Sequence, residues 1–338
     1  MKTIQLPLLS TFLFFIAMPL LPNILDDLQA DSRYKIEIYA SDLDSPRQLA
    51  ESADGWIFIG SRSGGTIFAV KDTDGNGESD TKSIVAEGLS MATGVSLFNG
   101  DLFFSEINKI WKIENIDAFL KKNSAELPEK ILVTDNLPSD KWHGWKWIMH
   151  DENGSLYTNV GAPCNVCLSE DKRYASILRL SEGSWDYVAR GVRNSVGFDI
   201  HPISKKLYFT DNGRDWLGDD SPSCELNKVD QEGSFYGFPY KHAKNIIDPE
   251  FGNLDTGFQF IDPIAELGAH VAPTGITFYE GEMFPELKHN ILITLHGSWN
   301  RSSKVGYKVI RVSLDKRGNV ANIQDFISGW LINDKVSG

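Results

Sequence analysis

The chain has 338 residues, of which 41% are hydrophobic and 23% charged, a composition typical of a folded globular protein and unlike that of a disordered or fibrous one. Its 33 Lys+Arg against 46 Asp+Glu give a formal net charge of −13. This acidic balance excludes nonspecific binding to nucleic acid, because neutralising phosphates requires clustered Lys and Arg. Any site for an anion must therefore be local.

The N-terminal segment has the pattern of a secretory signal peptide: Lys2, a mostly apolar run over residues 4–21, and no further charge before Asp26. We expect residues 1–30 to be a signal peptide or an N-terminal anchor, and the protein to be periplasmic or secreted. Prolines in this segment disfavour a stable membrane-spanning helix, so no membrane span is expected after processing.

One strand pattern recurs five times: a short alternating strand, a polar turn, a second strand ending in small or polar residues, a loop, and a third apolar strand. The five copies start at the equivalent positions Pro46, Thr93, His143, Arg193 and Thr274. Successive starting positions are 47, 50, 50 and 81 residues apart. Apart from the last value, which reflects an insertion, these match the roughly 40–50 residues of a propeller blade. The sequence therefore predicts an all-β protein, a β-propeller domain over residues 34–338 with five recognisable blades of a six-bladed architecture.

Ring closure is predicted to involve residues 35–40, whose sequence KIEIYA reads as an N-terminal strand that pairs with the last blade. Residues 323–330 provide one outer strand of the fifth blade, and residues 116–122 are the only convincing helix. Two alternatives remain open. Either the protein is a five-bladed ring, or a sixth blade is missing and two open sheet edges face each other across a gap.

The three cysteines, Cys164, Cys167 and Cys224, permit at most one disulfide and one free thiol. Leu168 follows the first two where c-type haem attachment would require His, and no second Cys pair or paired His completes a zinc site nearby. We therefore expect a structural cysteine pair. The spacing alone does not identify which two are bonded.

In a four-stranded antiparallel blade, the inner strand starts on the face where the second strand ends, so two sets of loop residues meet near the axis. The starts contribute Arg47, Thr93, His143, Arg193, Asn194 and Thr274, and the ends contribute Arg62, Glu106 and residues 161–167, 211–214 and 296–301. Five arginines belong to these sets, and guanidinium groups match carboxylates, so we predict a pocket for a small, multiply anionic ligand. The alternative is that these arginines pair with the chain's own carboxylates.

His143 is the candidate catalytic residue. It lies between Trp142 and Gly144, close to Trp145 and Trp147, an aromatic and partly desolvated setting in which an imidazole could stay neutral and act as a general base. The alternative is a structural histidine.

Two segments are candidate calcium sites. Residues 211–220, DNGRDWLGDD, are rich in carboxylates and glycine, and the backbone carbonyls of Gly213 and Arg214 could hold calcium; a solvated acidic loop is the alternative. Residues 72–80, DTDGNGESD, match the opening of a calcium loop, but Ser83 stands where the bidentate Glu belongs. A glycine-rich hairpin turn is the preferred interpretation there. No GxSxG, P-loop or post-strand GxGxxG motif supports a hydrolase, NTPase or nicotinamide enzyme.

Several motifs together resemble the glucose/sorbosone dehydrogenases, soluble six-bladed propellers that use pyrroloquinoline quinone (PQQ) and calcium to oxidise aldoses. The resemblance covers most of residues 34–330 and is strongest to the sorbosone-type branch of soluble aldose sugar dehydrogenase-like proteins. The motifs are Pro46-Arg47, HGWK at 143–146, GAPCNVC at 161–167, ARGVRNSVGFD at 189–199, DNGRDWLGDD at 211–220, ELN at 225–227, YGFPY at 236–240, APTGITFY at 272–279 and HGSWNRS at 296–302.

The resemblance implies a role for each matching residue. His143 would be the general base that takes the proton from the anomeric hydroxyl of a small sugar while hydride passes to the quinone, giving the lactone or acid. Electrons would then pass to a soluble acceptor or a cytochrome. Gly213 and Arg214 would hold Ca2+ through their carbonyls. The implied PQQ contacts are Arg193, Asn194, Thr274, His296 and Arg301.

The sequence departs from the family at three places. Val196 stands where glucose-oxidising relatives carry Gln, so the resemblance does not identify the substrate of this protein as theirs. Lys241 stands where many relatives have Cys and Cys224 where many have Asp, which suggests a changed disulfide partner for the CNVC loop. Relatives continue past residue 330 into a sixth blade with further arginine contacts. The chain is therefore expected to be C-terminally incomplete, of low stability and weak in PQQ binding.

Two other functions remain open. A non-catalytic sugar-binding or interaction propeller would keep the fold with a decayed cofactor site. A metal-dependent lactonase propeller would need carboxylate and Asn ligands around the axis, where this sequence offers Arg and His.

Overall fold

The computed structural model describes residues 24–122 and 124–337. Most of the predicted signal peptide therefore lies outside the described residues. Its last part forms a short helix, α1 (Ile24–Asp27), and a short strand, β1 (Gln29–Ala30). Within the described ranges, every helix is too short or too polar to cross a bilayer.

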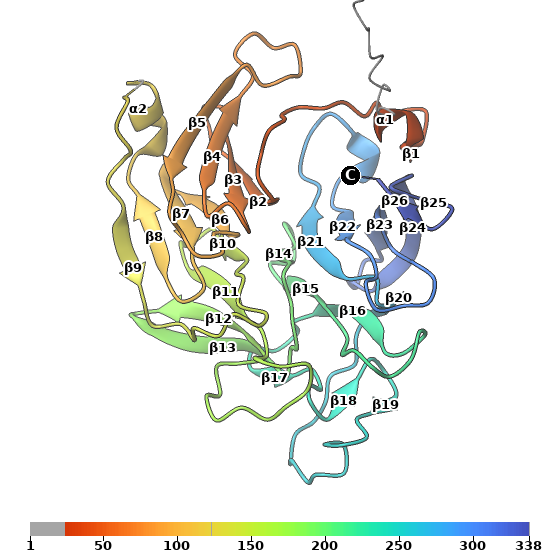
Figure 1. The fold of residues 1–338 in the computed structure, drawn as a ribbon. Helices are drawn as coiled ribbons and strands as arrows, with labels where there is room; N and C mark the ends of the chain where they lie inside the picture. The colour runs from red at the N-terminus through yellow and green to blue at the C-terminus, as the bar shows by residue number, and fades with distance from the viewer. Residues whose placement is uncertain (1–23, 123, 338) are drawn as a thin grey trace, which may run out of the picture.

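Five sheets fan out around a common centre as the blades of a β-propeller (Figure 1), which confirms the predicted all-β architecture with five blades. The first blade contains β2 (Pro46–Glu51), β3 (Ile57–Ser61), β4 (Ile67–Lys71) and β5 (Thr81–Ala86). The second contains β6 (Val95–Phe98), β7 (Asp101–Ser105), β8 (Ile110–Ile113) and β9 (Ile131–Thr134).

The remaining three blades repeat the same antiparallel order. The third contains β10 (Ile148–His150), β11 (Leu156–Val160), β12 (Ser176–Ser181) and β13 (Ser184–Arg190). The fourth contains β14 (Phe198–Ile200), β15 (Leu207–Asp211), β16 (Ser223–Lys228) and β20 (Ala265–Ala269). The fifth contains β21 (Pro273–Phe278), β22 (Ile291–Leu295), β23 (Lys308–Leu314) and β24 (Val320–Ser328).

The predicted helix is confirmed as α2 (Ile116–Leu120), which lies between the last two strands of the second blade. The insertion of the fourth repeat follows β16 and contains β17 (Ser234–Phe235), β18 (Lys241–His242) and β19 (Ile246–Ile247). Because β17 pairs in parallel with β13, the insertion packs against the third blade. A 3-10 turn, η1 (Pro285–Leu287), precedes β22.

The hydrophobic core lies between neighbouring blades. Fully buried side chains from adjacent sheets form four clusters, for example Phe58 with Phe104 between the first two blades and Ile110 with Ile148 between the next two. Burying each such side chain stabilises the fold by roughly 1.5–3 kcal/mol. Among the described residues, no comparable cluster joins the fifth blade to the first.

A single buried side chain, Gln48 on β2, holds three inner strands together. Its Nε2 donates to the carbonyl of Ile148 at 2.7 Å, and its Oε1 accepts from the backbone N–H groups of Val95 at 3.2 Å and Ile148 at 3.1 Å. Further round the axis, the Trp147 indole donates to the carbonyl of Phe198 at 2.9 Å. These bonds satisfy buried polar groups and fix the inner strands relative to one another.

The predicted closing strand is wrong, because residues 35–40 form no strand. The N-terminal pairing on the fifth blade is made instead by β1, whose residue Gln29 opposes Ser328 of β24. Residues 31–45 then cross from the fifth blade to the first (Figure 1). The end of this segment covers the first blade, whereas Ile38 is 49% exposed. Tyr39 packs with Ala40 and Leu43 over Ile59, Phe68 and Val70.

Hydrogen bonds attach this crossing segment at both ends. Tyr34 donates through its hydroxyl to Glu286 of the fifth blade at 2.9 Å. The Tyr39 carbonyl accepts from the Ser79 N–H at 2.7 Å on the first blade. The predicted outer strand of the fifth blade is confirmed as β24, and a small hairpin, β25 (Leu331–Ile332) and β26 (Lys335–Val336), follows it.

Candidate functional site

His143 lies in the loop before β10 in the left-handed backbone region, with φ 50°. Its Nδ1 is 2.8 Å from the carbonyl oxygen of Ala162, and its Nε2 accepts a hydrogen bond from the Trp142 indole at 3.2 Å. Because a carbonyl can only accept, Nδ1 carries the proton and Nε2 presents a lone pair. Burial and the positive charge of Arg193 lower the pKa of His143 to about 3, so the ring is neutral at physiological pH.

Arg193 lies just before β14 and is 4% exposed. Its guanidinium donates to the carbonyl of Asn165 at 2.8 Å, to the carbonyl of Gly213 at 3.0 Å, and forms an ion pair with Asp215 at 3.4 Å. Its backbone N–H donates to the buried Asp211 carboxylate at 2.8 Å. Arg193 thus ties together two loops that are about 50 residues apart in sequence.

The loop over residues 161–167 is closed by a disulfide between Cys164 and Cys167, and Cys224 is free and buried. The expected cysteine pair is therefore within the CNVC loop itself, and Cys224 is not its partner. Asn165, between the two cysteines, accepts from the Asp215 N–H at 2.8 Å and donates to the Asp215 carbonyl at 3.2 Å. The disulfide loop thereby positions the loop over residues 211–220.

Asn194 places an unsatisfied polar atom beside His143. Its Oδ1 is buried and has no hydrogen-bond partner among the described residues. A Cβ added to Gly161 would lie 2.6 Å from the His143 Cβ and 3.3 Å from this Oδ1, so glycine permits the close approach of both groups. Leaving a buried acceptor unpaired costs about 1–3 kcal/mol. This atom is therefore suited to accept a hydrogen bond from a ligand.

Three of the five predicted arginines are paired with the chain's own carboxylates. Arg193 pairs with Asp215, as described above. Arg214 contacts the buried Asp248 of the insertion. Arg301 pairs with Asp220 at 2.8 Å. These three arginines therefore follow the alternative prediction, in which they pair with carboxylates of the protein itself and not with a ligand.

The other two, Arg47 and Arg62, have no carboxylate partner among the described residues. Both guanidinium groups lie over the indole of Trp145, at 5.6 and 4.3 Å from its ring centroid. Burial and the charge of Arg62 lower the pKa of Arg47. His296 of the fifth blade is exposed, and partial desolvation together with Arg47 lowers its pKa. Two like charges held against one indole favour a bound anion.

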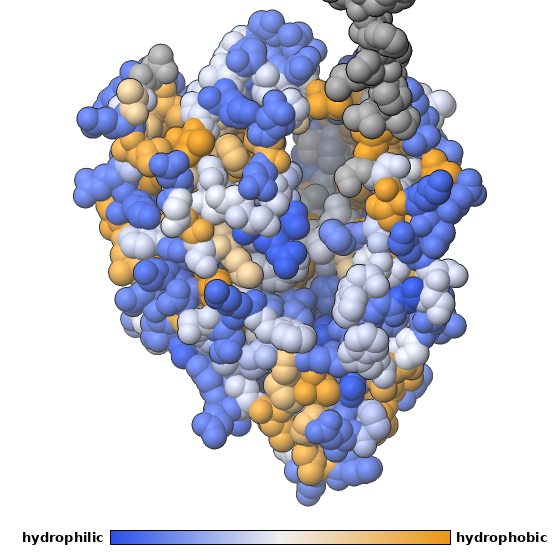
Figure 2. Space-filling model, in the orientation of Figure 1, coloured by the Kyte–Doolittle hydropathy of each residue, from blue (hydrophilic) through white to orange (hydrophobic). Residues whose placement is uncertain are grey.

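Arg47 and Arg62 come from the first blade and His296 from the fifth, and the molecular surface is hollowed between these two blades (Figure 2). Thr274 and Glu106 were also predicted to lie at the site, and the side chains of both form hydrogen bonds with other protein groups. Thr274 faces Thr294 within the fifth blade, with 3.3 Å between their hydroxyl oxygens. Glu106 accepts from the Ser90 N–H at 2.8 Å and from the Trp111 indole at 2.9 Å, so its carboxylate stabilises the second blade.

The two carbonyl groups predicted to bind calcium are not both free to accept a cation. The Gly213 carbonyl already accepts from Arg193 at 3.0 Å, so a cation there would face a guanidinium group unless Arg193 moved. Two buried carboxylates, Asp211 and Glu225, lie close by, and burial raises the pKa of both. Binding of Ca2+ by Gly213 and Arg214 stays a prediction.

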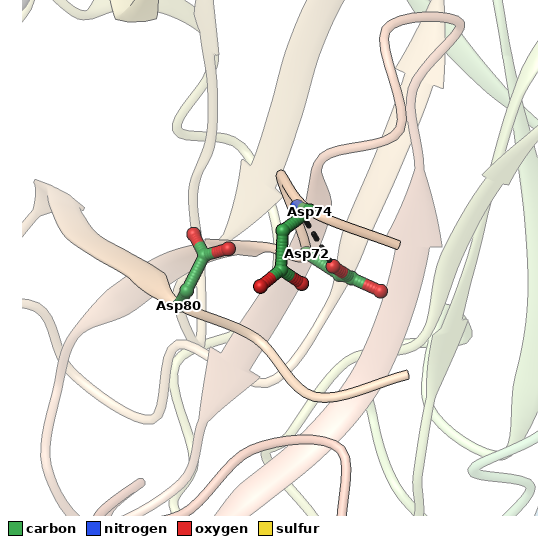
Figure 3. A group of neighbouring side chains, drawn as sticks. All are labelled: Asp72, Asp74 and Asp80. Atoms are coloured by element: carbon green, nitrogen blue, oxygen red, sulfur yellow. Dashed lines mark hydrogen bonds between the residues drawn. The ribbon is translucent and has the colours of Figure 1, made fainter. Parts of the chain in front are cut away.

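The calcium-like segment over residues 72–80 forms the turn between β4 and β5, as preferred. Ligand atoms of Asp72, Asp74 and Asp80 lie within 4.8 Å of one another (Figure 3). The Asp72 carboxylate accepts from the backbone N–H groups of Gly75 at 2.7 Å and Gly77 at 2.8 Å. These hydrogen bonds stabilise the conformation of the acidic turn, so a bound ion is not needed to explain it.

Three features of this face could not be predicted from the sequence. Asn165 lies in a nominated loop, but only the fold shows that it contacts Arg193. Lys146 is buried, and its Nζ donates to the carbonyl of Gly144 at 2.7 Å, next to His143. Trp216 and Trp299 are 69% and 71% exposed. Exposure and long-range contact leave no signal in a single sequence.

The fold and the site define a β-propeller whose loops gather a neutral histidine, unpaired arginines and an unsatisfied amide on one face. The chain is 35% identical over 324 residues to an uncharacterized protein of Borreliella burgdorferi, a match that covers 93% of this chain and 84% of that protein. It belongs to the same family as that protein. Residues 256–328 also match the family described as TrAA12-like.

Solved structures share the fold at low sequence identity. The holo PQQ domain of pyranose dehydrogenase from Coprinopsis cinerea superimposes with a TM-score of 0.74 at 15% identity, over 92% of this chain and 88% of that one. A family AA12 carbohydrate-active enzyme of Trichoderma reesei gives 0.73 at 17%, over 89% and 87%. The PQQ-bound aldose sugar dehydrogenase of Streptomyces coelicolor gives 0.63 at 21%, over 88% and 84%.

Proposed function

We propose that the protein is a PQQ-dependent oxidoreductase that oxidises an aldose or a related sugar aldehyde or hemiacetal at the anomeric carbon, giving the lactone or acid. The protein is exported to the periplasm or secreted and passes electrons to a soluble acceptor or a cytochrome. One observation carries the proposal: a neutral His143, whose Nε2 is an acceptor, lies close to the unpartnered Asn194 oxygen. The named activities of the structural neighbours support it.

The residues on this face suit PQQ, which is a planar tricarboxylate. Arg47 and Arg62 offer unpaired guanidinium groups for its carboxylates, with His296 nearby. The unpartnered Asn194 oxygen offers an acceptor for a ligand N–H. Bound PQQ would supply the quinone that accepts hydride from the sugar.

His143 would act as the general base. The Ala162 carbonyl fixes the tautomer, so Nε2 is the nitrogen that receives the proton of the anomeric hydroxyl. The Trp142 indole, which now donates to Nε2, must yield this position to the hydroxyl. The low pKa keeps the base in its neutral form. A carboxylate bound nearby would raise this pKa toward a value better suited to accepting a proton.

Titration of the purified protein with PQQ, with and without Ca2+, tests this function directly. Absorbance of the quinone reports binding, and adding a panel of aldoses tests sugar-driven reduction. We expect the Arg47→Gln/Arg62→Gln double variant to lose PQQ affinity and His143→Ala to retain binding but lose reduction. Lys316→Gln/Arg317→Gln, in an exposed turn after β23, is the matched control for loss of two positive charges. The absence of PQQ binding by the unaltered protein would contradict the proposal.

A non-catalytic sugar-binding or interaction propeller is the second candidate. It is favoured by the internal pairing of Arg193 and Arg301, two of the residues that the resemblance assigns to the cofactor. Binding of a sugar by a protein that binds no PQQ would select this function.

A further inference from the structure

Two exposed tryptophans form a contiguous aromatic surface beside the site. Trp216 lies in the loop between β15 and β16 and Trp299 in the loop between β22 and β23, on neighbouring blades. Their rings meet edge to face, with centroids 5.7 Å apart and planes at 88°. They are 69% and 71% exposed. Neither indole contributes to a buried core cluster, so core packing does not explain why two large aromatic side chains face solvent.

The backbone at Trp216 adds a second observation. Its φ is 72°, in the left-handed region that a bulky side chain rarely adopts. Such a conformation is strained and persists only where the surroundings impose it, commonly at ligand sites. The strain therefore points to a requirement for the indole in this position.

Hydrogen bonds beneath the rings hold the two loops together. The Asp215 carboxylate, one residue before Trp216, accepts from the Asn300 amide, one residue after Trp299, at 2.6 Å. Asp215 is also ion-paired with the buried Arg193. These contacts fix the two loops that carry the tryptophans. A rigid aromatic surface binds a ligand with little loss of conformational freedom.

The polar groups around the pair suit a carbohydrate. The Asn300 Oδ1 and the Arg301 Nε are buried and have no hydrogen-bond partner among the described residues. The Asp220 carboxylate is 88% exposed. A pyranose ring presents an apolar C–H face to an indole and hydroxyl groups to amide, carboxylate and guanidinium groups around it.

A chain of polar contacts connects the loop of Trp216 to the proposed catalytic histidine. Asp215 contacts Arg193, the Arg193 carbonyl accepts from the Ala162 N–H at 2.8 Å, and the Ala162 carbonyl is bonded to His143. We propose that Trp216 and Trp299 form an outer subsite that stacks a pyranose ring of an oligosaccharide whose reducing end reaches His143. The substrate class is then an oligosaccharide rather than a free monosaccharide, an inference that rests on the proposed function.

Binding of neutral oligosaccharides to the protein without added cofactor tests the subsite independently of catalysis. Isothermal titration calorimetry would follow titration with β-linked and α-linked glucose oligomers of one to four units. We expect a trisaccharide to bind about tenfold more tightly than glucose, which corresponds to one stacking contact. The Trp216→Ala/Trp299→Ala variant should lose this preference. Ile203→Ala, an equally exposed apolar residue at the opposite end of the fourth blade, should keep it.

The outcomes separate this inference from the function on which it rests. If PQQ binds and sugars reduce it, but the tryptophan variant retains the affinity of the unaltered protein for the trisaccharide, the subsite is disproved and the dehydrogenase stands. If PQQ does not bind, yet oligosaccharide binding depends on the two tryptophans, the subsite stands and the dehydrogenase fails. Equal affinity for glucose and every longer oligomer overturns the subsite as well.

Discussion

Asn165 and Arg193 form a two-point contact: the Asn165 carbonyl accepts from Arg193 Nε at 2.8 Å, and its side-chain oxygen accepts from Arg193 Nη2 at 2.9 Å. The flanking disulfide between Cys164 and Cys167 holds Asn165 in place. A guanidinium that is 4% exposed needs such acceptors, because burying a charge without hydrogen bonds is strongly unfavourable. This contact therefore orders the loops around His143.

Asn165→Ala should destabilise the protein and loosen the site together. The side-chain oxygen also accepts from the Asp215 N–H at 2.8 Å, so the variant leaves buried donors on Arg193 and Asp215 unpaired. We expect a loss of roughly 1–3 kcal/mol in the free energy of unfolding, measured by urea denaturation. Hydrogen exchange should become faster in residues 211–215.

Asn153→Ala is the matched control, since Asn153 is an exposed residue in a turn of the third blade. It should leave both measurements unchanged. Unaltered hydrogen exchange in residues 211–215 of Asn165→Ala would show that the asparagine does not position this loop.

The cysteines give a second prediction through their reactivity. Cys224 is free but buried, and burial raises the pKa of its thiol, so it should not react with a thiol reagent in the folded protein. We expect no reactive thiol in the native state, one per chain after unfolding without reductant, and three after unfolding with reductant. Two or more thiols in the unfolded, unreduced protein would exclude the disulfide between Cys164 and Cys167.

Much of the architecture follows from local sequence. Alternating strands and turns define the five blades, and the antiparallel order then places the strand starts and ends on one face. The strand pattern predicts that His143, Asn194 and the loop over residues 161–167 lie at the site, and the structure brings them together. Each signal of this kind is contained within a few residues.

The pairing of the arginines could not be predicted in the same way. Arg214 contacts Asp248, which lies in the insertion, and Arg301 contacts Asp220 of another blade. These partners are 34 and 81 residues away in sequence, and only the packed fold determines which arginines stay unpaired. The apolar residues of 35–40 were similarly ambiguous, because their alternation predicts a strand whereas Tyr39 and Ala40 cover the first blade.

The hydrogen bond from Trp142 to His143 yields a third prediction. The indole donates to Nε2 at 3.2 Å and so stabilises the neutral ring. Trp142→Phe removes this donor, and the pKa of His143 should rise from its lowered value of about 3. Nitrogen chemical shifts of the imidazole, followed by NMR between pH 3 and 7, measure the change. Trp185→Phe, on an outer strand of the third blade, is the control. An unchanged or lower pKa would contradict the assigned tautomer.

The buried amine of Lys146 makes stability depend on pH in the alkaline range. Burial lowers the pKa of Lys146 to about 7, whereas the unfolded chain has its ordinary value near 10.5. Between these values the unfolded state binds the proton and the native state does not. The free energy of unfolding should therefore rise with pH from about 7 to 10, by roughly 1 kcal/mol per pH unit from this residue, with no contribution to the slope below pH 7.

Lys146→Met isolates this effect, because methionine has a similar length and no charge to bury. The variant should lose the hydrogen bond to Gly144, but its free energy of unfolding should rise less steeply with pH than that of the unaltered protein. Urea denaturation at several pH values from 7 to 10 gives both slopes. Since all other titrating groups are shared, the difference between the slopes belongs to Lys146. Parallel slopes would mean that the amine is protonated in the folded protein and that its charge is compensated within the core.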